Sequence, residues 1–211
     1  MLKQFIKACL GGLAISIGAV AYLSVDNKVI GSFLFSLGIF TIYSFGFSLY
    51  TGKVCFIPNK EPSFCKNVGI TYLGNAVGTV LTGLILPFTK LKKLIPALQV
   101  VVEQKLNDTL LSSFIMAILC GVLICISVMG YIKIKDGLGK YIALILPIMV
   151  FILSGFEHSI ANLFYYTFAS SWSFKAVIYS FFIAIGNCLG GMLIPLAVKY
   201  TEGSKLGCEE K

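Results

Sequence analysis

The segment from Tyr141 to Phe168 reads YIALILPIMVFILSGFEHSIANLFYYTF and decides the class of fold. It consists of two apolar runs that flank the sequence Gly-Phe-Glu-His-Ser, which contains the only histidine of the protein. An ionisable side chain inside a membrane span costs a few kcal/mol and usually faces a cavity or a pore. Glu157 and His158 are therefore the first candidate functional residues.

The composition of the whole chain is that of an integral membrane protein. Of its 211 residues, 57% are hydrophobic and 12% are charged, and the mean hydropathy is +0.91. Soluble proteins carry about 25% charged residues. The length allows about six spans of ~20 residues with short connections. We expect a single transmembrane domain over residues 1–211, with the lipid bilayer as its surroundings.

Six apolar segments can be laid along the chain. We predict spans at residues 4–24, 31–57, 67–89, 109–132, 141–169 and 175–199. The second and fifth segments are longer than a span requires, and both contain glycine and polar residues. Glycine permits non-helical backbone, which is tolerated at membrane depth only where it is buried in protein or lines water. We therefore predict two broken helices whose loops face the interior.

The lysines indicate the orientation of the chain. With six spans, 11 lysines fall on the side of both termini and 6 on the other, so the termini are expected to be cytoplasmic. Long lysine side chains at membrane interfaces account for much of the formal charge of +8. The chain has no arginine and no basic patch that alternates with aromatic residues, so we expect no nucleic-acid partner.

The two halves of the chain repeat each other. Gly46-Phe47 recurs 109 residues later as Gly155-Phe156, and the pattern Gly-Asn-x-x-Gly from Gly74 recurs 112 residues later from Gly186. Three spans in each half, approximately residues 1–100 and 101–211, imply that the halves are inverted across the membrane. Inverted repeats with a broken helix in each half are typical of transport proteins.

The seven cysteines do not predict a metal centre. No Cys-x-x-Cys pair occurs, and one histidine cannot build a histidine-rich site. Cysteine is an ordinary small apolar residue in a span. We expect no metal and no cofactor.

The motif from Ser154 to Asn162, SGFEHSIAN, resembles the most diagnostic motif of the formate/nitrite transporter family. Further matches lie at Phe35–Gly38, Leu49–Thr51 and Gly186–Gly191, and the similarity covers nearly the whole chain. The resemblance implies a homopentamer with an aquaporin-like protomer and one pore in each protomer. It also implies small anions as partners, such as formate, nitrite or hydrosulfide, and a place in the cytoplasmic membrane.

The same resemblance assigns candidate pore residues. Outer and inner constrictions would be formed by apolar and aromatic side chains: Phe35, Ile39 and Phe151 on the outside, Leu49 and Tyr50 on the inside. Between them, Thr51 and His158 would offer hydrogen bonds, and Lys105 a positive field. Glu157 would orient the loop or hold the histidine tautomer, and Asn187 would tie that loop down.

These residue types suit the passage of weak-acid anions. A bare anion in an apolar constriction faces a large desolvation penalty. Histidine, with an ordinary pKa near 6.5, can lend a proton so that the anion passes in neutral form. Three alternatives stay open: an integral membrane enzyme with His158 as acid or base, a neutral-solute pore, and a scaffold or assembly subunit. We expect no enzyme because no cofactor motif or second histidine occurs, and the Asn-Pro-Ala loops of water pores are missing.

Overall fold

The computed structural model describes residues 1–135 and 137–202, and every regular element in that part of the chain is a helix. The α-helices are α1 (Leu2–Leu23), α2 (Lys28–Phe45), α3 (Tyr50–Lys53), α4 (Phe64–Ile85), α5 (Ile95–Asn107), α6 (Leu110–Lys133), α7 (Gly137–Leu153), α8 (Ser159–Phe168) and α9 (Phe174–Glu202). Short 3₁₀ helices complete the order: η1 (Val54–Asn59), η2 (Leu86–Phe88) and η3 (Lys90–Leu94).

The apolar helices correspond to the predicted segments. Five are long and apolar enough to cross a membrane, namely α1, α2, α4 extended by η2, α6 and α9. A sixth, α7, is apolar but has only 17 residues. The all-helical membrane fold predicted from the sequence is confirmed.

Both predicted breaks are present, and each contains a glycine with positive φ. The chain leaves α2 through Gly46, whose φ of +64° lies in the left-handed region, and leaves α7 near Gly155, whose φ is +70°. Glycine adopts this conformation without steric cost. After each turn the chain runs without regular structure to one extended residue, Leu49 or His158, and then begins a second helix, α3 in the first half and α8 in the second. The segments 31–57 and 141–169 are thus interrupted helices.

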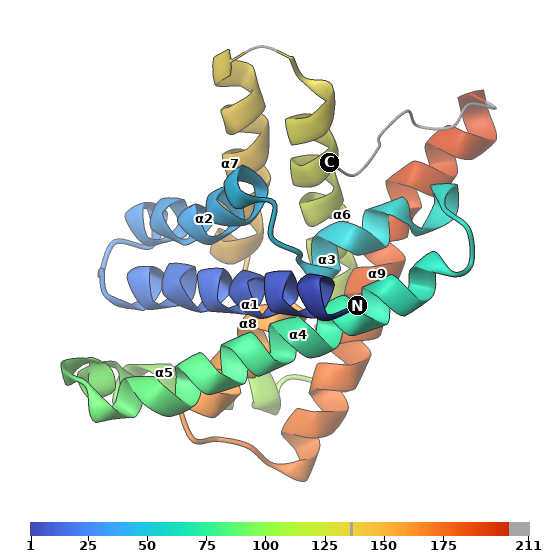
Figure 1. Ribbon diagram of the computed structural model, residues 1–211. Coiled ribbons are helices and arrows are strands. Elements are labelled where there is room, and N and C mark those ends of the chain that lie inside the picture. Colours follow the sequence, from blue (N-terminus) through green and yellow to red (C-terminus); the bar gives the residue numbers. More distant parts are fainter. Residues whose placement is uncertain (136, 203–211) are drawn as a thin grey trace.

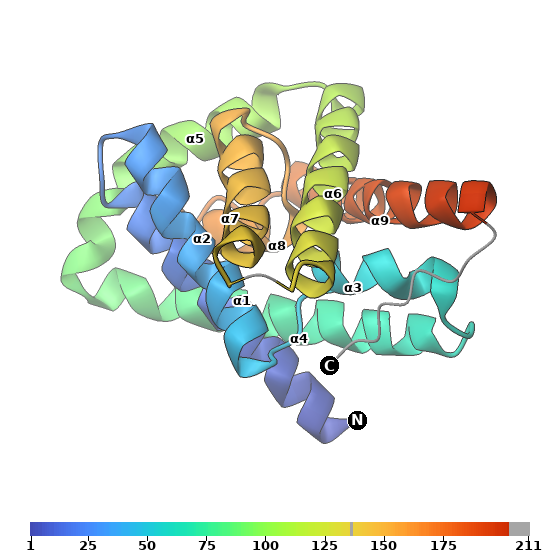
Figure 2. The same cartoon turned by 90° about the horizontal axis from the view of Figure 1, so that it is seen from above.

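The second half of the chain repeats the helix order and the packing of the first. Helix α1 packs on α2 and α4, and α6 packs in the same way on α7 and α9 (Figures 1 and 2). Glycines allow both close crossings. A side-chain carbon added to Gly12 would collide with the carbonyl oxygen of Asn75, and one added to Gly121 would collide with that of Asn187. The repeat seen in the sequence therefore extends to equivalent backbone contacts.

The core lies where the broken helices meet. All ten residues of α8 are buried, and α8 packs on α4 and α9 and also contacts α1 and α5. Helix α5 was not predicted. It lies in the connection between α4 and α6, and it buries Leu98 and Val102, which are one helical turn apart. This helix places Lys105 beside the second break.

Candidate functional site

The two breaks meet at a contact between Thr51 and His158. Thr51 lies in the first turn of α3, and His158 is the residue directly before α8. Thr51 Oγ1 is 3.1 Å from His158 Nε2, and the two residues are 0% and 2% exposed. The contact joins the two halves of the repeat at a buried point.

The second nitrogen of the His158 ring fixes its tautomer. The Ala161 amide donates a hydrogen bond of 3.1 Å to Nδ1, which caps the N-terminus of α8. A ring nitrogen that accepts carries no proton, so the neutral ring carries its proton on Nε2. Nε2 therefore donates to Thr51 Oγ1, and the hydroxyl hydrogen of Thr51 can be offered to another acceptor.

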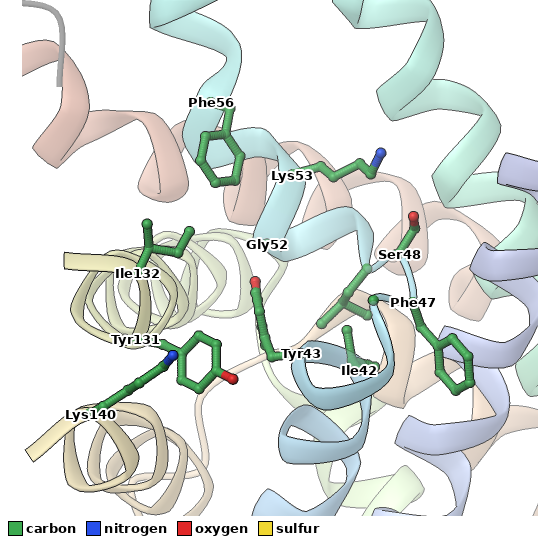
Figure 3. Close-up of a pocket in the computed structure, with 12 residues that line it drawn as sticks. Ile42, Tyr43, Phe47, Ser48, Gly52, Lys53, Phe56, Tyr131, Ile132 and Lys140 are labelled. Carbon is green, nitrogen blue, oxygen red and sulfur yellow. The ribbon is translucent and has the colours of Figure 1, made fainter. Parts of the chain in front are cut away.

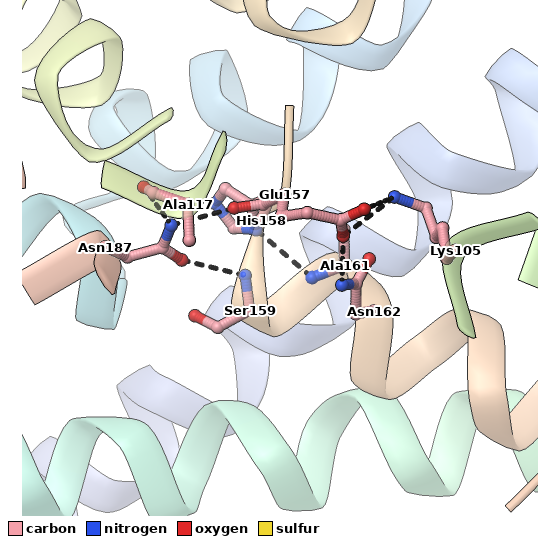
Figure 4. A network of polar contacts seen from close by, with 8 residues as sticks. All are labelled: Lys105, Ala117, Glu157, His158, Ser159, Ala161, Asn162 and Asn187. Carbon is pink, nitrogen blue, oxygen red and sulfur yellow. Dashed lines mark hydrogen bonds and ion pairs between the residues drawn. The ribbon is translucent and has the colours of Figure 1, made fainter. Parts of the chain in front are cut away.

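Glu157 forms an ion pair with Lys105 on the other side of the loop (Figure 4). Lys105 Nζ lies 2.9 Å from both carboxylate oxygens, and Asn162 Nδ2 donates to Oε2 at 2.6 Å. The Lys105 and Glu157 side chains are 16% and 3% exposed. The positive field predicted for Lys105 is thus largely balanced by the carboxylate.

Asn187 of α9 holds the backbone of the same loop (Figure 4). Its Oδ1 accepts from the Ser159 amide at 2.8 Å, and its Nδ2 donates to the carbonyl oxygens of Glu157 and Ala117, both at 2.8 Å. Asn187 is fully buried. The predicted tether is therefore made by three hydrogen bonds, one of which reaches α6.

Aromatic rings lie against the imidazole. Phe35 of α2 contacts Phe151 of α7 edge-on, with 6.1 Å between ring centroids. Phe151 in turn stacks on the His158 ring, with centroids 5.6 Å apart and 17° between planes. Ile39 is buried one turn of α2 after Phe35. An apolar cluster of Phe35, Ile39 and Phe151 therefore lies next to the polar contact.

Two cavities approach these residues from opposite ends of α2 and α7. A smaller cavity of about 110 Å³ is lined by Phe35, Phe151, Lys105 and His158, near the start of α2 and the end of α7. A larger one of about 260 Å³ is lined by the end of α2, the start of α7 and Leu49 (Figure 3). Thr51 and Ile39 are buried and line neither cavity.

The structure separates the two residues predicted for the inner constriction. Leu49 lines the larger cavity, whereas Tyr50 is not part of its lining. The Tyr50 hydroxyl donates to the Ala184 carbonyl of α9 at 2.9 Å, and its ring lies edge-on to Tyr72 of α4, 5.0 Å away. Tyr50 therefore packs between α4 and α9, and Leu49 is the one that reaches the cavity.

Two polar partners of Glu157, namely Asn162 and Lys105, were not predicted from the sequence. Asn162 belongs to the family motif, and the structure adds its hydrogen bond to the Glu157 carboxylate. A signal was available, because Asn162 follows Glu157 by five residues across the start of α8, and a helix brings such a side chain back toward its own N-terminus. The Lys105–Glu157 pair had no such signal, since 52 residues separate the two.

Known proteins resemble this chain over most of its length. Residues 1–201 match the family described as formate/nitrite transporter. Formate channel FocB of Escherichia coli is 28% identical over 90% of this chain and 83% of its own length. Formate channel FocA of the same species is 28% identical over 77% of this chain, which spans 65% of FocA. The formate-nitrite transporter of Plasmodium falciparum is 23% identical over 95% of this chain and 79% of its length.

Solved structures share the fold. A pentameric formate channel with formate bound superimposes with a TM-score of 0.80 at 24% identity, over 94% of this chain and 95% of the other. An ion channel of the same family gives 0.83 at 19% identity, over 96% and 90%. The match across the chain shows that the protein is a multi-pass membrane transport protein and not an enzyme. The chain belongs to the formate/nitrite transporter family.

Proposed function

We propose that the protein is a channel for small monovalent anions of weak acids, with formate, nitrite and hydrosulfide as the candidate substrates. The Thr51–His158 contact carries the proposal, because it presents polar hydrogens between two cavities that open toward opposite ends of α2 and α7. The named functions of the relatives, formate channels in two cases, support the same reading.

In this proposal Phe35, Ile39 and Phe151 form an apolar barrier in the pore, and this barrier is the reason why the substrate is a weak acid. An anion that leaves water for a site walled by Phe35, Ile39 and Phe151 loses its hydration, at a cost of several kcal/mol per ion. Donors at Thr51 and His158 offset part of that cost. A weak-acid anion can remove the rest by taking up a proton and crossing the rings as a neutral molecule.

The tautomer restricts how His158 supplies that proton. In the neutral ring Nδ1 accepts from Ala161, so the ring holds a single proton, on Nε2. It can give this proton away only if a second one reaches the ring, and protonation of Nδ1 breaks the bond to Ala161. We infer that the site first binds the anion by hydrogen bonds and that proton transfer accompanies a movement of the ring.

The Lys105–Glu157 pair has a supporting role in this scheme. The pair keeps the small cavity close to electrical neutrality while the lysine still offers N–H donors at the cavity wall. An unpaired buried carboxylate at this position would repel an approaching anion. Lys105 therefore serves the pore by compensating Glu157.

The remaining features of the proposal concern assembly and location. We infer a homopentamer with one pore in each protomer, formed by a single transmembrane channel domain. Its termini lie in the cytoplasm, as the lysine distribution indicates. The bilayer is the cytoplasmic membrane.

Uptake by proteoliposomes tests the function. Purified protein is reconstituted, and uptake of radiolabelled formate is compared with empty vesicles, with glycerol as a neutral solute. Nitrite and hydrosulfide are compared by stopped-flow fluorescence with an internal pH dye. We expect anion flux that falls in Thr51→Ala and His158→Asn, with no glycerol flux. Glycerol flux without anion flux would identify a neutral-solute pore, and no flux of either kind would refute the proposal.

A further inference from the structure

Asn75 makes contacts at the first break that match those of Asn187 at the second. It is fully buried in α4. Its Oδ1 accepts from the Tyr50 amide at 2.8 Å, and its Nδ2 donates to the carbonyl oxygens of Ser48 and Ala8 at 2.8 and 2.7 Å. One side chain thus pairs backbone groups of the first loop and of α1.

Asn187 makes hydrogen bonds to the same three kinds of backbone group as Asn75. Asn187 accepts from the amide of Ser159 and donates to the carbonyls of Glu157 and Ala117. Each of these three residues follows its counterpart in the first half by 109 positions, and Asn187 follows Asn75 by 112. The match of bonded atoms at a fixed offset shows that both asparagines have the same structural task.

By holding the first loop, Asn75 sets the position of Thr51. The amide that Asn75 holds belongs to Tyr50, the residue directly before Thr51, and Thr51 Oγ1 is 3.1 Å from His158 Nε2. A hydrogen bond of this length tolerates little displacement of the loop. We propose that Asn75 is a positioning residue for anion passage, which acts through Thr51 as Asn187 acts through His158. The statement on passage rests on the proposed channel function.

Helix α1 packs closely against Asn75. Gly11 of α1 lies directly against Asn75 Nδ2 and the Ser48 carbonyl oxygen. A side-chain carbon added to Gly11 would collide with the carbonyl oxygen and crowd the amide nitrogen. Without the side-chain amide of Asn75, which is fully buried, the backbone amide of Tyr50 and the carbonyl oxygens of Ser48 and Ala8 each lose a partner. Such groups move to find new partners, since an unsatisfied buried backbone group is costly.

A double-mutant experiment tests the role in passage. Formate uptake is measured in proteoliposomes for Asn75→Ala, Thr51→Ala and the double variant, together with the uptake ratio of formate to the larger anion acetate. Asn67→Ala, eight residues earlier on α4, is the matched control. We expect Asn75→Ala to lower formate uptake on the order of tenfold and to change the ratio, as the loss of about one net hydrogen bond would.

The double variant decides whether Asn75 acts through Thr51. If it does, adding Asn75→Ala to Thr51→Ala lowers uptake by less than about twofold, since coupled residues are not additive. Two independent full effects would overturn the inference while leaving the channel function intact. Unchanged uptake in Asn75→Ala, in a parent that conducts formate, would overturn it as well.

Hydrogen exchange gives a readout that does not need conduction. In detergent, Asn75→Ala is expected to speed amide exchange at Tyr50–Lys53 at least tenfold and to leave residues 158–162 unchanged. Asn187→Ala should give the opposite pattern. If either variant speeded amide exchange equally in both segments, or speeded it in neither segment, the assignment would be overturned. This holds even if the protein carried no anion. Asn75→Ser, which keeps an acceptor for the Tyr50 amide, covers the case in which the alanine variant does not fold.

Discussion

Replacing Lys105 by methionine is expected to destabilise the protein, because the Glu157 carboxylate stays buried without its cation. Lys105 Nζ lies 2.9 Å from both Glu157 oxygens, and the carboxylate side chain is 3% exposed. Removal of one partner of a buried ion pair costs about 3–5 kcal/mol. We take the lower end, since Asn162 keeps its hydrogen bond to the carboxylate. For a chain of this size, about 3 kcal/mol corresponds to a fall of roughly 6–12 °C in Tm.

The measurement is the thermal unfolding of purified protein in detergent. The matched control is Lys93→Met, because Lys93 is an exposed lysine in the same connection, and its change should stay within about 0.5 kcal/mol. The double variant Lys105→Met/Glu157→Gln removes the uncompensated charge and should recover most of the lost Tm, and formate uptake should follow the same order. A Lys105→Met protein that melts within 2 °C of the parent would refute the reasoning. A double variant less stable than Lys105→Met would do the same.

Three further outcomes are expected. His158→Asn should change anion selectivity or the pH dependence of flux between pH 5 and 8 without preventing assembly; identical flux profiles in parent and variant would exclude proton transfer by this residue. Native mass spectrometry in mild detergent should give a pentamer, and a monodisperse monomer or dimer would contradict it. Gly121→Ala should lower stability by about 1–3 kcal/mol, because the new carbon meets the Asn187 carbonyl. Gly69→Ala, which enters open space, should be neutral or slightly stabilising.

Much of the architecture could be predicted because membrane physics limits the choices. Apolar length predicts spans, and glycine with polar residues inside an overlong span predicts a break. Both predicted breaks are present, and each contains a glycine with positive φ, Gly46 or Gly155. The family resemblance assigned Asn187 to the second loop, and its side chain makes hydrogen bonds to the backbone of that loop. These are local patterns, and a single sequence contains them in full.

Pairings across long separations could not be predicted in the same way. Lys105 and Glu157 are 52 residues apart, and their contact depends on α5, a helix in a connection that has too few apolar residues to indicate a span. The direction of the Tyr50 ring depends on space between α4 and α9 that the sequence does not describe. Only the folded packing decides which of two neighbouring side chains faces a cavity.

The chemistry of the site arises where the two halves of the repeat differ. His158 and Leu49 occupy equivalent positions 109 residues apart, both in extended backbone directly before a helix, and Thr51 is equivalent to Ile160. Asparagine and glycine hold the two loops alike, so the side chains at these positions can differ without disturbing the backbone. The first half then supplies a hydroxyl and the second an imidazole. A repeat thus fixes where two loops meet, and its departures from symmetry decide which groups meet there.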